Sequence, residues 1–478
     1  MGVDKNIIAI ELGSSSIRGI IGQRRPDGSL KVLGYEKEHT PDCIRKGVVY
    51  NIDKTIQAIS AIVNRISDSR KVYVKKVYVG VSGQSLCTVG NKVTQQFEVK
   101  TAINDEIVDS LMDTNRAQGY QEAEILDVLP QEYNVGGRLT IEPVGIMTDR
   151  IEGLYKNIVA RKLLRENIQR CMQGAQLEVA DYFISPLLLA NYLLVDTEKR
   201  SGCALVDFGA ETTTVIVFEK NILRHLVVIP LGGNNITMDL ANSLQIEFDE
   251  AEELKLRYGS AYTKDEENPV SQPIELSNDR KTDLKTVLNI IEARQQEILE
   301  NVWNQIKSYE DRLLAGVFCT GGAANMKNLD VAFAQYLKFD KVKTRIMPSV
   351  TDFTTSLKLD TQTNTLATLI AMLRKGDQEC TSEKPVEPEL FQEPIVEVPQ
   401  TPAQPTTIKT GEGVVTPPVA EVKPEPETST PEPESASEPE STTKGTTEPA
   451  TEKVKKPGAF KRLWNSFTRI TETIVEEK

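Results

Sequence analysis

The chain has few of the residues that build metal centres. Its 478 residues include two histidines and six scattered cysteines, with no CxxC pair. This composition excludes a histidine-based metal centre or a zinc ribbon. Most of the cysteines stand in apolar runs, so we expect buried thiols in a reducing compartment. They are Cys43, Cys87, Cys171, Cys203, Cys319 and Cys380.

Long apolar runs and an excess of positive charge are missing as well. No stretch of 18 apolar residues occurs and residues 1–5 begin no signal peptide, so we expect a cytosolic protein that could still be tethered. The formal net charge is −13 and the first 375 residues carry no basic stripe, which argues against a nucleic-acid partner. The chain also has neither a P-loop nor a serine-hydrolase elbow.

A repeated strand–turn–strand pattern is the most informative feature that is present. Residues 7–19 and 204–215 each contain an apolar strand, an acid, a polar turn with glycine and a second apolar strand. One copy would be an ordinary turn. Two copies from two half-chains can face one nucleotide and hold its phosphates and metal between them. The pair therefore predicts a bilobal ATP clamp.

The residues of this clamp have distinct expected roles. Glu11 and Asp207 would hold Mg²⁺ through waters, because magnesium keeps much of its hydration shell. Arg18 would neutralise phosphate charge or, alternatively, be a solvated strand residue. Gly232-Gly233 precede a helix whose positive end would lie near the phosphates. Gly321-Gly322 would admit a base or ribose, although a plain left-handed turn would use them too. The phosphate-binding candidates are Gly13, Ser14, Ser15, Ser16, Arg18, Gly209, Thr212 and Thr213.

Strands and helices alternate through residues 1–376, which predicts an α/β protein. In residues 84–162 we expect short strands around a helix at 105–119. Residues 163–196 should form a helix, a strand and a helix. Elsewhere we expect strands at 31–36, 76–81 and 317–320 and helices at 54–67, 237–244, 248–258 and 282–314.

The composition changes near Gly376, and about 80 residues rich in Pro, Glu, Thr and Ser follow. Such a stretch buries too little apolar surface to offset its ordering entropy, so it is expected to be a disordered spacer. After this stretch, apolar residues recur at helical spacing, and the opposite face of the expected helix is basic. This predicts an interfacial helix on an anionic membrane surface, or alternatively a helix that packs on the folded part. Its apolar face holds Phe460, Leu463, Trp464, Phe467, Ile470 and Ile474.

Several short motifs carry a resemblance to a known family. They are Val128–Tyr133, Leu223–Pro230, Glu252–Lys255 and Thr320–Ala324, followed by the tail helix. In this order they resemble the FtsA family of bacterial cell-division proteins, within the superfamily of actin, sugar kinases and heat-shock chaperones. The resemblance covers nearly everything outside the linker.

The resemblance implies a bilobal actin-like α/β fold with an FtsA-type inserted subdomain, then a disordered linker and a C-terminal amphipathic helix. It implies ATP and Mg²⁺ in the cleft, self-association into protofilaments, and location at the septum on the cytoplasmic face of the inner membrane. Its implied partners are the C-terminal peptide of the tubulin-like FtsZ and later division proteins, which would bind 84–162. By position, Glu252 and Lys255 resemble an adenosine-contacting pair, and Arg294 resembles the arginine that holds the FtsZ peptide.

The resemblance also assigns domain boundaries. Subdomain 1A would comprise 1–83, 163–196 and 345–376, with 84–162 as inserted subdomain 1C. Subdomain 2A would comprise 197–234 and 312–344, with 235–311 as subdomain 2B. The linker would be 377–457 and the membrane helix 458–478.

Two departures from the family pattern bear on activity. Many relatives carry three consecutive glycines where this chain has Gly209-Ala210-Glu211, and the wider superfamily usually has aspartate in place of Glu11. Glu211 would bring negative charge towards the γ-phosphate unless it points away. No residue stands out as a general base, so we expect a nucleotide-regulated scaffold with slow or absent hydrolysis. The alternatives are a sugar kinase of the same fold and an actin-like pilus-assembly scaffold.

Overall fold

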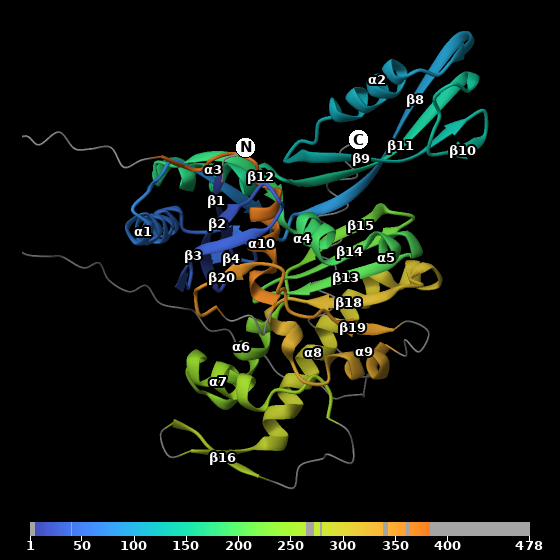
Figure 1. Ribbon diagram of the computed structural model, residues 1–478. Helices are drawn as coiled ribbons and strands as arrows, with labels where there is room; N and C mark the ends of the chain where they lie inside the picture. Colours follow the sequence, from blue (N-terminus) through green and yellow to red (C-terminus); the bar gives the residue numbers. More distant parts are fainter. Residues whose placement is uncertain are drawn as a thin grey trace, which may run out of the picture. The chain divides into compact units, whose positions relative to one another are not determined.

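A six-stranded sheet built around the first hairpin organises the N-terminal part of the chain (Figure 1). β1 and β2 form the hairpin, β3 continues it antiparallel, and β7 and β12 extend it on the other side in parallel. In sheet order the strands are β12 (Glu178–Ile184), β7 (Lys76–Val81), β1 (Lys5–Leu12), β2 (Ser16–Arg24), β3 (Leu30–His39) and β20 (Thr354–Thr355). The computed structural model describes residues 5–39, 41–263, 272–277, 280–337, 343–359 and 364–382.

Helices cover both faces of this sheet, which explains why β1 is apolar without alternation. Ile7, Ile8, Ala9 and Ile10 are all fully buried, as expected for a central strand covered on both sides. A Cβ on Gly19 would meet Ile62 of α1 (Ile52–Arg70), and one on Gly22 would meet Leu373 of α10 (Ala367–Lys375). Since these glycines lie three positions apart, the two helices pack on opposite faces.

The second sheet repeats this arrangement in the other half of the chain. β13 and β14 form the hairpin, β15 continues it antiparallel, and β18 and β19 extend it in parallel. In sheet order these strands are β19 (Thr344–Ile346), β18 (Gly316–Thr320), β13 (Cys203–Phe208), β14 (Thr213–Glu219) and β15 (Ile222–Ile229). The strand order matches that of the first sheet from β12 to β3, so the sequence repeat is a repeat of a whole sheet.

An inserted segment adds four strands to the second sheet beyond β15. They are β8 (Cys87–Ala102), β11 (Met147–Arg161), β9 (Ala123–Val135) and β10 (Arg138–Thr140), with α2 (Asp105–Arg116) packed along them. The prediction of short strands was wrong, since three of them are 13–16 residues long. The pairing of β9 with β11 shifts register between Leu154 and Tyr155, opposite Pro130. Such a bulge lets a strand continue past a proline.

The remaining elements connect and cover the sheets. The first half contains β4 (Ile44–Arg45), β5 (Val48–Val49), β6 (Tyr73–Val74), α3 (Lys162–Gly174), α4 (Ser185–Leu193) and α5 (Asp196–Ser201). The second half contains α6 (Gly233–Leu244), α7 (Phe248–Tyr258), β16 (Pro273–Glu275), β17 (Lys281–Asp283), α8 (Leu284–Ile306), η3 (Lys307–Arg312), η4 (Gly322–Asn325), α9 (Leu329–Leu337) and η5 (Asn364–Leu366). Among the described helices, none is both long and apolar enough to cross a membrane.

Three predicted boundaries need correction. The helix predicted at 282–314 is interrupted, because α8 ends at Ile306 and a 3₁₀-helix follows. α6 begins four residues earlier than predicted, because Asn235 Oδ1 accepts the Gly232 N–H and so stabilises the helix start. The linker was predicted from 377, yet β21 (Thr381–Ser382) pairs with β6 and Cys380 is fully buried. The rest of the predicted linker and the tail helix lie outside the described residues.

Candidate nucleotide site

The turns of the two hairpins have the same geometry. The Gly13 N–H donates to the Ser16 carbonyl oxygen at 3.2 Å, and the Gly209 N–H donates to the Thr212 carbonyl oxygen at 2.8 Å. A Cβ on either glycine would lie 2.9 Å from that oxygen, which explains why each turn begins with glycine. The turns are therefore equivalent in structure as well as in sequence.

The two acids that precede these turns, Glu11 and Asp207, are close enough for their charges to interact. Burial, and after it the charge of Glu11, raises the pKa of Asp207 to about 6, against the opposing effect of Arg18. Glu11 Oε2 is buried without a hydrogen-bond donor and lies 3.7 Å from Arg18 Nε. A buried carboxylate oxygen without a donor is destabilising. The arrangement suits a hydrated cation placed between the two carboxylates.

Arg18 is held by the protein and does not extend into solvent. Its side chain is 16% exposed, and Nη1 donates to the Thr365 carbonyl oxygen. The solvated-strand alternative was therefore wrong, because a segment from the far end of the chain covers this part of β2. Beside Glu11 and close enough to Asp207 to lower its pKa, the guanidinium is placed where it would offset negative charge in the clamp.

Two of the predicted phosphate ligands serve the turns themselves. Ser16 and Thr213 are the equivalent first residues of β2 and β14, and they are 1% and 0% exposed. The Thr213 hydroxyl donates to the Leu231 carbonyl oxygen at 2.8 Å. The Thr213 hydroxyl is therefore engaged by a residue just after β15 and is not available to a phosphate. The hydroxyl of Ser14 instead contacts another loop.

That loop is the turn between β4 and β5, hereafter the 46–47 turn. Ser14 Oγ accepts the Gly47 N–H at 3.0 Å, and Glu211 Oε2 accepts the Lys46 N–H at 2.6 Å. Both turn residues have positive φ angles, 51° and 76°. The 46–47 turn thus bridges the two clamp turns. Sequence reasoning missed it, and the only local signal was a Lys-Gly pair between short apolar runs.

The start of α6 supports the second turn directly. The Gly233 N–H donates to the Gly209 carbonyl oxygen at 3.0 Å, and the Asn234 N–H donates to the Ala210 carbonyl oxygen at 2.6 Å. A Cβ on Gly232 would lie 2.6 Å from the latter oxygen. The positive helix end therefore lies at the clamp, but these two N–H groups hold the turn and do not face a ligand.

The predicted adenosine residues gather beside the second turn. Lys255 Nζ lies 2.6 Å from Glu252 Oε2 and 3.2 Å from the Gly233 carbonyl oxygen. A Cβ on Gly233 would lie 3.3 Å from Ala323 Cβ, in the segment that follows Gly321-Gly322. Gly321 has a φ of +91°, and a Cβ there would lie 2.3 Å from Asp207 Oδ1. Glycine is thus required both by the turn and by the closeness of the acid.

The predicted FtsZ-binding arginine lies on α8. Arg294 on α8 pairs with Asp239 on α6, with Nε–Oδ2 at 2.6 Å and Nη2–Oδ1 at 3.0 Å, and also with Glu297. Its side chain is one-quarter exposed. The six apolar residues predicted to insert into a membrane lie outside the described residues.

Comparison with known proteins decides the family. A model described as "Cell division protein FtsA" matches residues 204–370, and one described as "SHS2 domain inserted in FTSA" matches residues 83–159. Cell division protein FtsA of Porphyromonas gingivalis is 30% identical over 342 residues, 69% of this chain and 70% of the relative. That of Bacillus subtilis is 31% identical over 326 residues, 67% of this chain and 74% of the relative. This chain belongs to the FtsA family.

The family and the topology together confirm the predicted fold class, an actin-like α/β fold with an FtsA-type insertion. A solved structure titled as the PilM-PilN type IV pilus biogenesis complex shares the fold, with a TM-score of 0.54 at 14% identity over 77% of this chain and 98% of that one. This similarity shows the fold alone. Membership of the FtsA family sets aside the sugar-kinase and pilus-scaffold alternatives. The individual site residues and domain boundaries remain predictions.

Proposed function

We propose that this FtsA-family chain binds ATP·Mg²⁺ between its two hairpin turns and acts as a filament-forming scaffold of the division septum. The observation that supports this best is the pair of partly buried, interacting acids Glu11 and Asp207, which come from equivalent positions of two equivalent sheets. Each acid precedes a glycine turn. Among the described residues, no group of three His, Cys, Asp or Glu side chains could hold a metal ion. A cation here would therefore rely on waters and on the phosphates of the nucleotide.

Each part of the site has a proposed task. Backbone N–H groups of the two turns would bind phosphate oxygens, and Arg18 would offset their charge. Gly321 leaves room for the Asp207 carboxylate, while Glu252 and Lys255 would contact the adenosine. The bound Mg²⁺ would neutralise phosphate charge. We propose slow or absent hydrolysis, because Glu211 adds a negative charge at the second turn.

The remaining roles of the protein follow from the proposed scaffold. Arg294 would bind the acidic C-terminal peptide of FtsZ, and the tail helix would tether filaments to the inner membrane. Residues 84–162 would bind later division proteins. Protofilament formation would strengthen a weak single-helix anchor through avidity.

The experiment that tests the nucleotide site is calorimetric titration of the full-length protein with ATP, with Mg²⁺ and then with a chelator in its place. We expect Mg²⁺ to strengthen ATP binding at least tenfold in the wild type. Glu11→Gln and Asp207→Asn should remove most of this gain, because each deletes one of the two charges that hold the hydrated ion. Glu98→Gln, on an exposed position of β8, is the matched control and should keep it.

The outcomes are clear-cut. No ATP binding, or equal affinity with and without Mg²⁺ in the wild type, would overturn the proposed site. If Mg²⁺ still strengthens ATP binding in both variants, the metal does not bind at these acids.

A further inference from the structure

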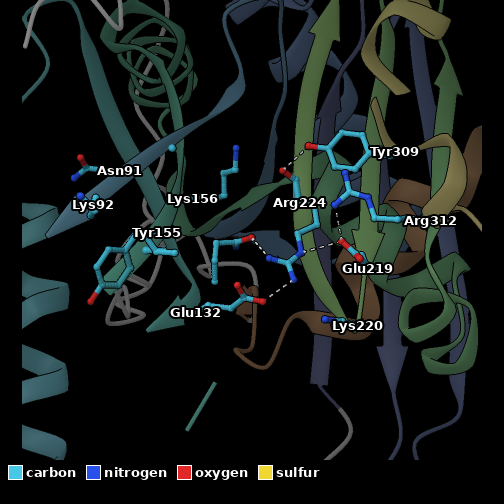
Figure 2. A pocket seen from close by; sticks show the side chains of 13 residues that line it. Asn91, Lys92, Glu132, Tyr155, Lys156, Glu219, Lys220, Arg224, Tyr309 and Arg312 are labelled. Atoms are coloured by element: carbon cyan, nitrogen blue, oxygen red, sulfur yellow. Dashed lines mark hydrogen bonds and ion pairs between the residues drawn. The ribbon is translucent and has the colours of Figure 1, made fainter. Parts of the chain in front are cut away.

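A separate depression of about 780 Å³, widely open to solvent and hereafter called the cavity, lies between the inserted segment and the second sheet's β14–β15 hairpin. Its walls come from β8, β9 and β11, from the β14–β15 hairpin, and from η3. None of the predicted nucleotide residues lines it. Figure 2 shows its side chains approaching from both sides of the space where β8 and β15 diverge. The two strands are paired only at Cys87 and Val227.

The lining is strongly cationic in a chain that is acidic overall. Five basic side chains face two carboxylates, Glu132 and Glu219, whereas the whole chain has a formal net charge of −13. The composition of the protein therefore does not explain the charge of the cavity. The basic residues are Lys92, Lys156, Lys220, Arg224 and Arg312.

Lys156 lies in an unfavourable position for a lysine. It is half-buried on β11, and within the described part of the chain its ammonium group makes no hydrogen bond or ion pair. Burial, and after it the positive charge of Arg224, lowers the pKa of its ammonium group. In Figure 2 it stands between the inserted strands and Tyr309 with no dashed line to a neighbour. A cation withdrawn from water beside another cation is destabilising unless an anion joins them.

The two arginines are held in place by acceptors of the protein. Arg224 lies 3.5 Å from both Glu132 and Glu219 and donates to Gln131 Oε1 at 3.2 Å. Its Nε is buried without a hydrogen-bond acceptor. Arg312 shares Glu219 at 3.3 Å, and its guanidinium lies over the ring of Tyr309. Guanidinium groups that are fixed in this way keep their positive charge beside a bound oxyanion.

We propose that this cavity binds a small ligand that carries two or more phosphate groups. Its volume falls within the roughly 300–1,000 Å³ typical of small-molecule sites. The cations come from β8, β11, the β14–β15 hairpin and η3 and line one space, which matches clustered negative charge. An extended acidic peptide would instead present its charges along a line. Because the ligand would contact both the inserted segment and the second sheet, its binding would tie these two parts together.

The test uses sodium tripolyphosphate as the probe and the full-length protein, with binding measured by calorimetry. ATP·Mg²⁺ equimolar with the protein is present in one series and absent in another, so that the hairpin turns are filled without an excess of ATP that would compete for the cavity. We expect one tripolyphosphate per chain in the presence of ATP. Lys156→Gln and Lys220→Gln should each weaken it at least tenfold, whereas Lys100→Gln, exposed on β8 outside the cavity, should leave it unchanged.

A second measurement distinguishes a binding site from a structural cluster. Without ligand, Lys156→Gln should melt at the same temperature as the wild type or higher, because it removes a repelled, half-buried charge. Tripolyphosphate should raise the melting temperature of the wild type and not that of the variant. No binding in the presence of ATP, equal weakening by Lys100→Gln, or tighter binding of a poly-glutamate peptide than of tripolyphosphate would each overturn the proposal.

Discussion

At the residue scale, Glu211 links the second turn of the nucleotide site to the 46–47 turn. It stands in the second clamp turn, and its carboxylate accepts the Lys46 N–H at 2.6 Å. The 46–47 turn therefore has one donor engaged by a carboxylate of the protein, close to where the nucleotide's terminal phosphate would compete for it. This contact explains how an acid is accommodated in a proposed phosphate-binding turn.

We expect Glu211→Gly to bind ATP·Mg²⁺ more tightly than the wild type, by roughly fivefold. A partly exposed charge repels a nearby anion by about 1 kcal/mol, and the Lys46 N–H would become available to the phosphate. The measurement is calorimetric titration of the full-length protein.

Glu211→Gln is the matched control, because it removes the charge and keeps an oxygen that can accept the Lys46 N–H. Affinity that rises in both variants would identify charge as the cause, whereas a rise only in Glu211→Gly would identify the hydrogen bond. Weaker binding in Glu211→Gly would show that the bridge to the 46–47 turn stabilises the binding-competent site.

At the scale of elements, the sequence predicts what depends on local patterns. β7 and α7 have the predicted bounds, and the two hairpins lie where the repeat placed them. Contacts distant in sequence could not be predicted in this way. The partner of Arg18 is Thr365, 347 residues away, and the 46–47 turn reaches Glu211, 165 residues away. The long inserted strands were missed because a bulge accommodates Pro130 within β9.

The helix pair α6–α8 permits a test of the proposed FtsZ contact. We expect Arg294→Glu to weaken binding of an acidic FtsZ C-terminal peptide at least tenfold, because it replaces a forked donor of carboxylate-binding geometry with a repelling charge. Fluorescence anisotropy of a labelled peptide measures this affinity. Melting curves are needed alongside, since the variant also leaves Asp239 and Glu297 without their shared partner.

Lys285→Glu is the matched control, because it makes the same charge change at an exposed position of the same helix. It should reduce peptide affinity only slightly. Equal losses of peptide affinity in the two variants would indicate a general effect of net charge. An unaltered affinity in Arg294→Glu would mean that the peptide binds elsewhere.

At the scale of the whole molecule, the proposed division of labour separates nucleotide binding from membrane attachment. The described residues contain both sheets and the paired acids. The residues proposed to insert into a membrane follow some 80 residues of acidic, proline-rich chain. Such a spacer would hold an anchor at a distance without transmitting strain to the clamp. The two activities should therefore be separable by mutation.

We expect Trp464→Glu to abolish co-sedimentation of the full-length protein with anionic liposomes and to leave its affinity for ATP·Mg²⁺ unchanged. A large apolar side chain contributes about 1.5–3 kcal/mol when fully buried, and a carboxylate would be repelled by anionic headgroups. Asn465→Glu adds the same charge on the opposite face of the proposed helix, so it should weaken sedimentation without abolishing it. If Trp464→Glu sediments like the wild type, the tail is not the anchor. If both variants lose binding equally, charge alone holds the protein to the lipid, and the amphipathic interpretation of residues 458–478 fails.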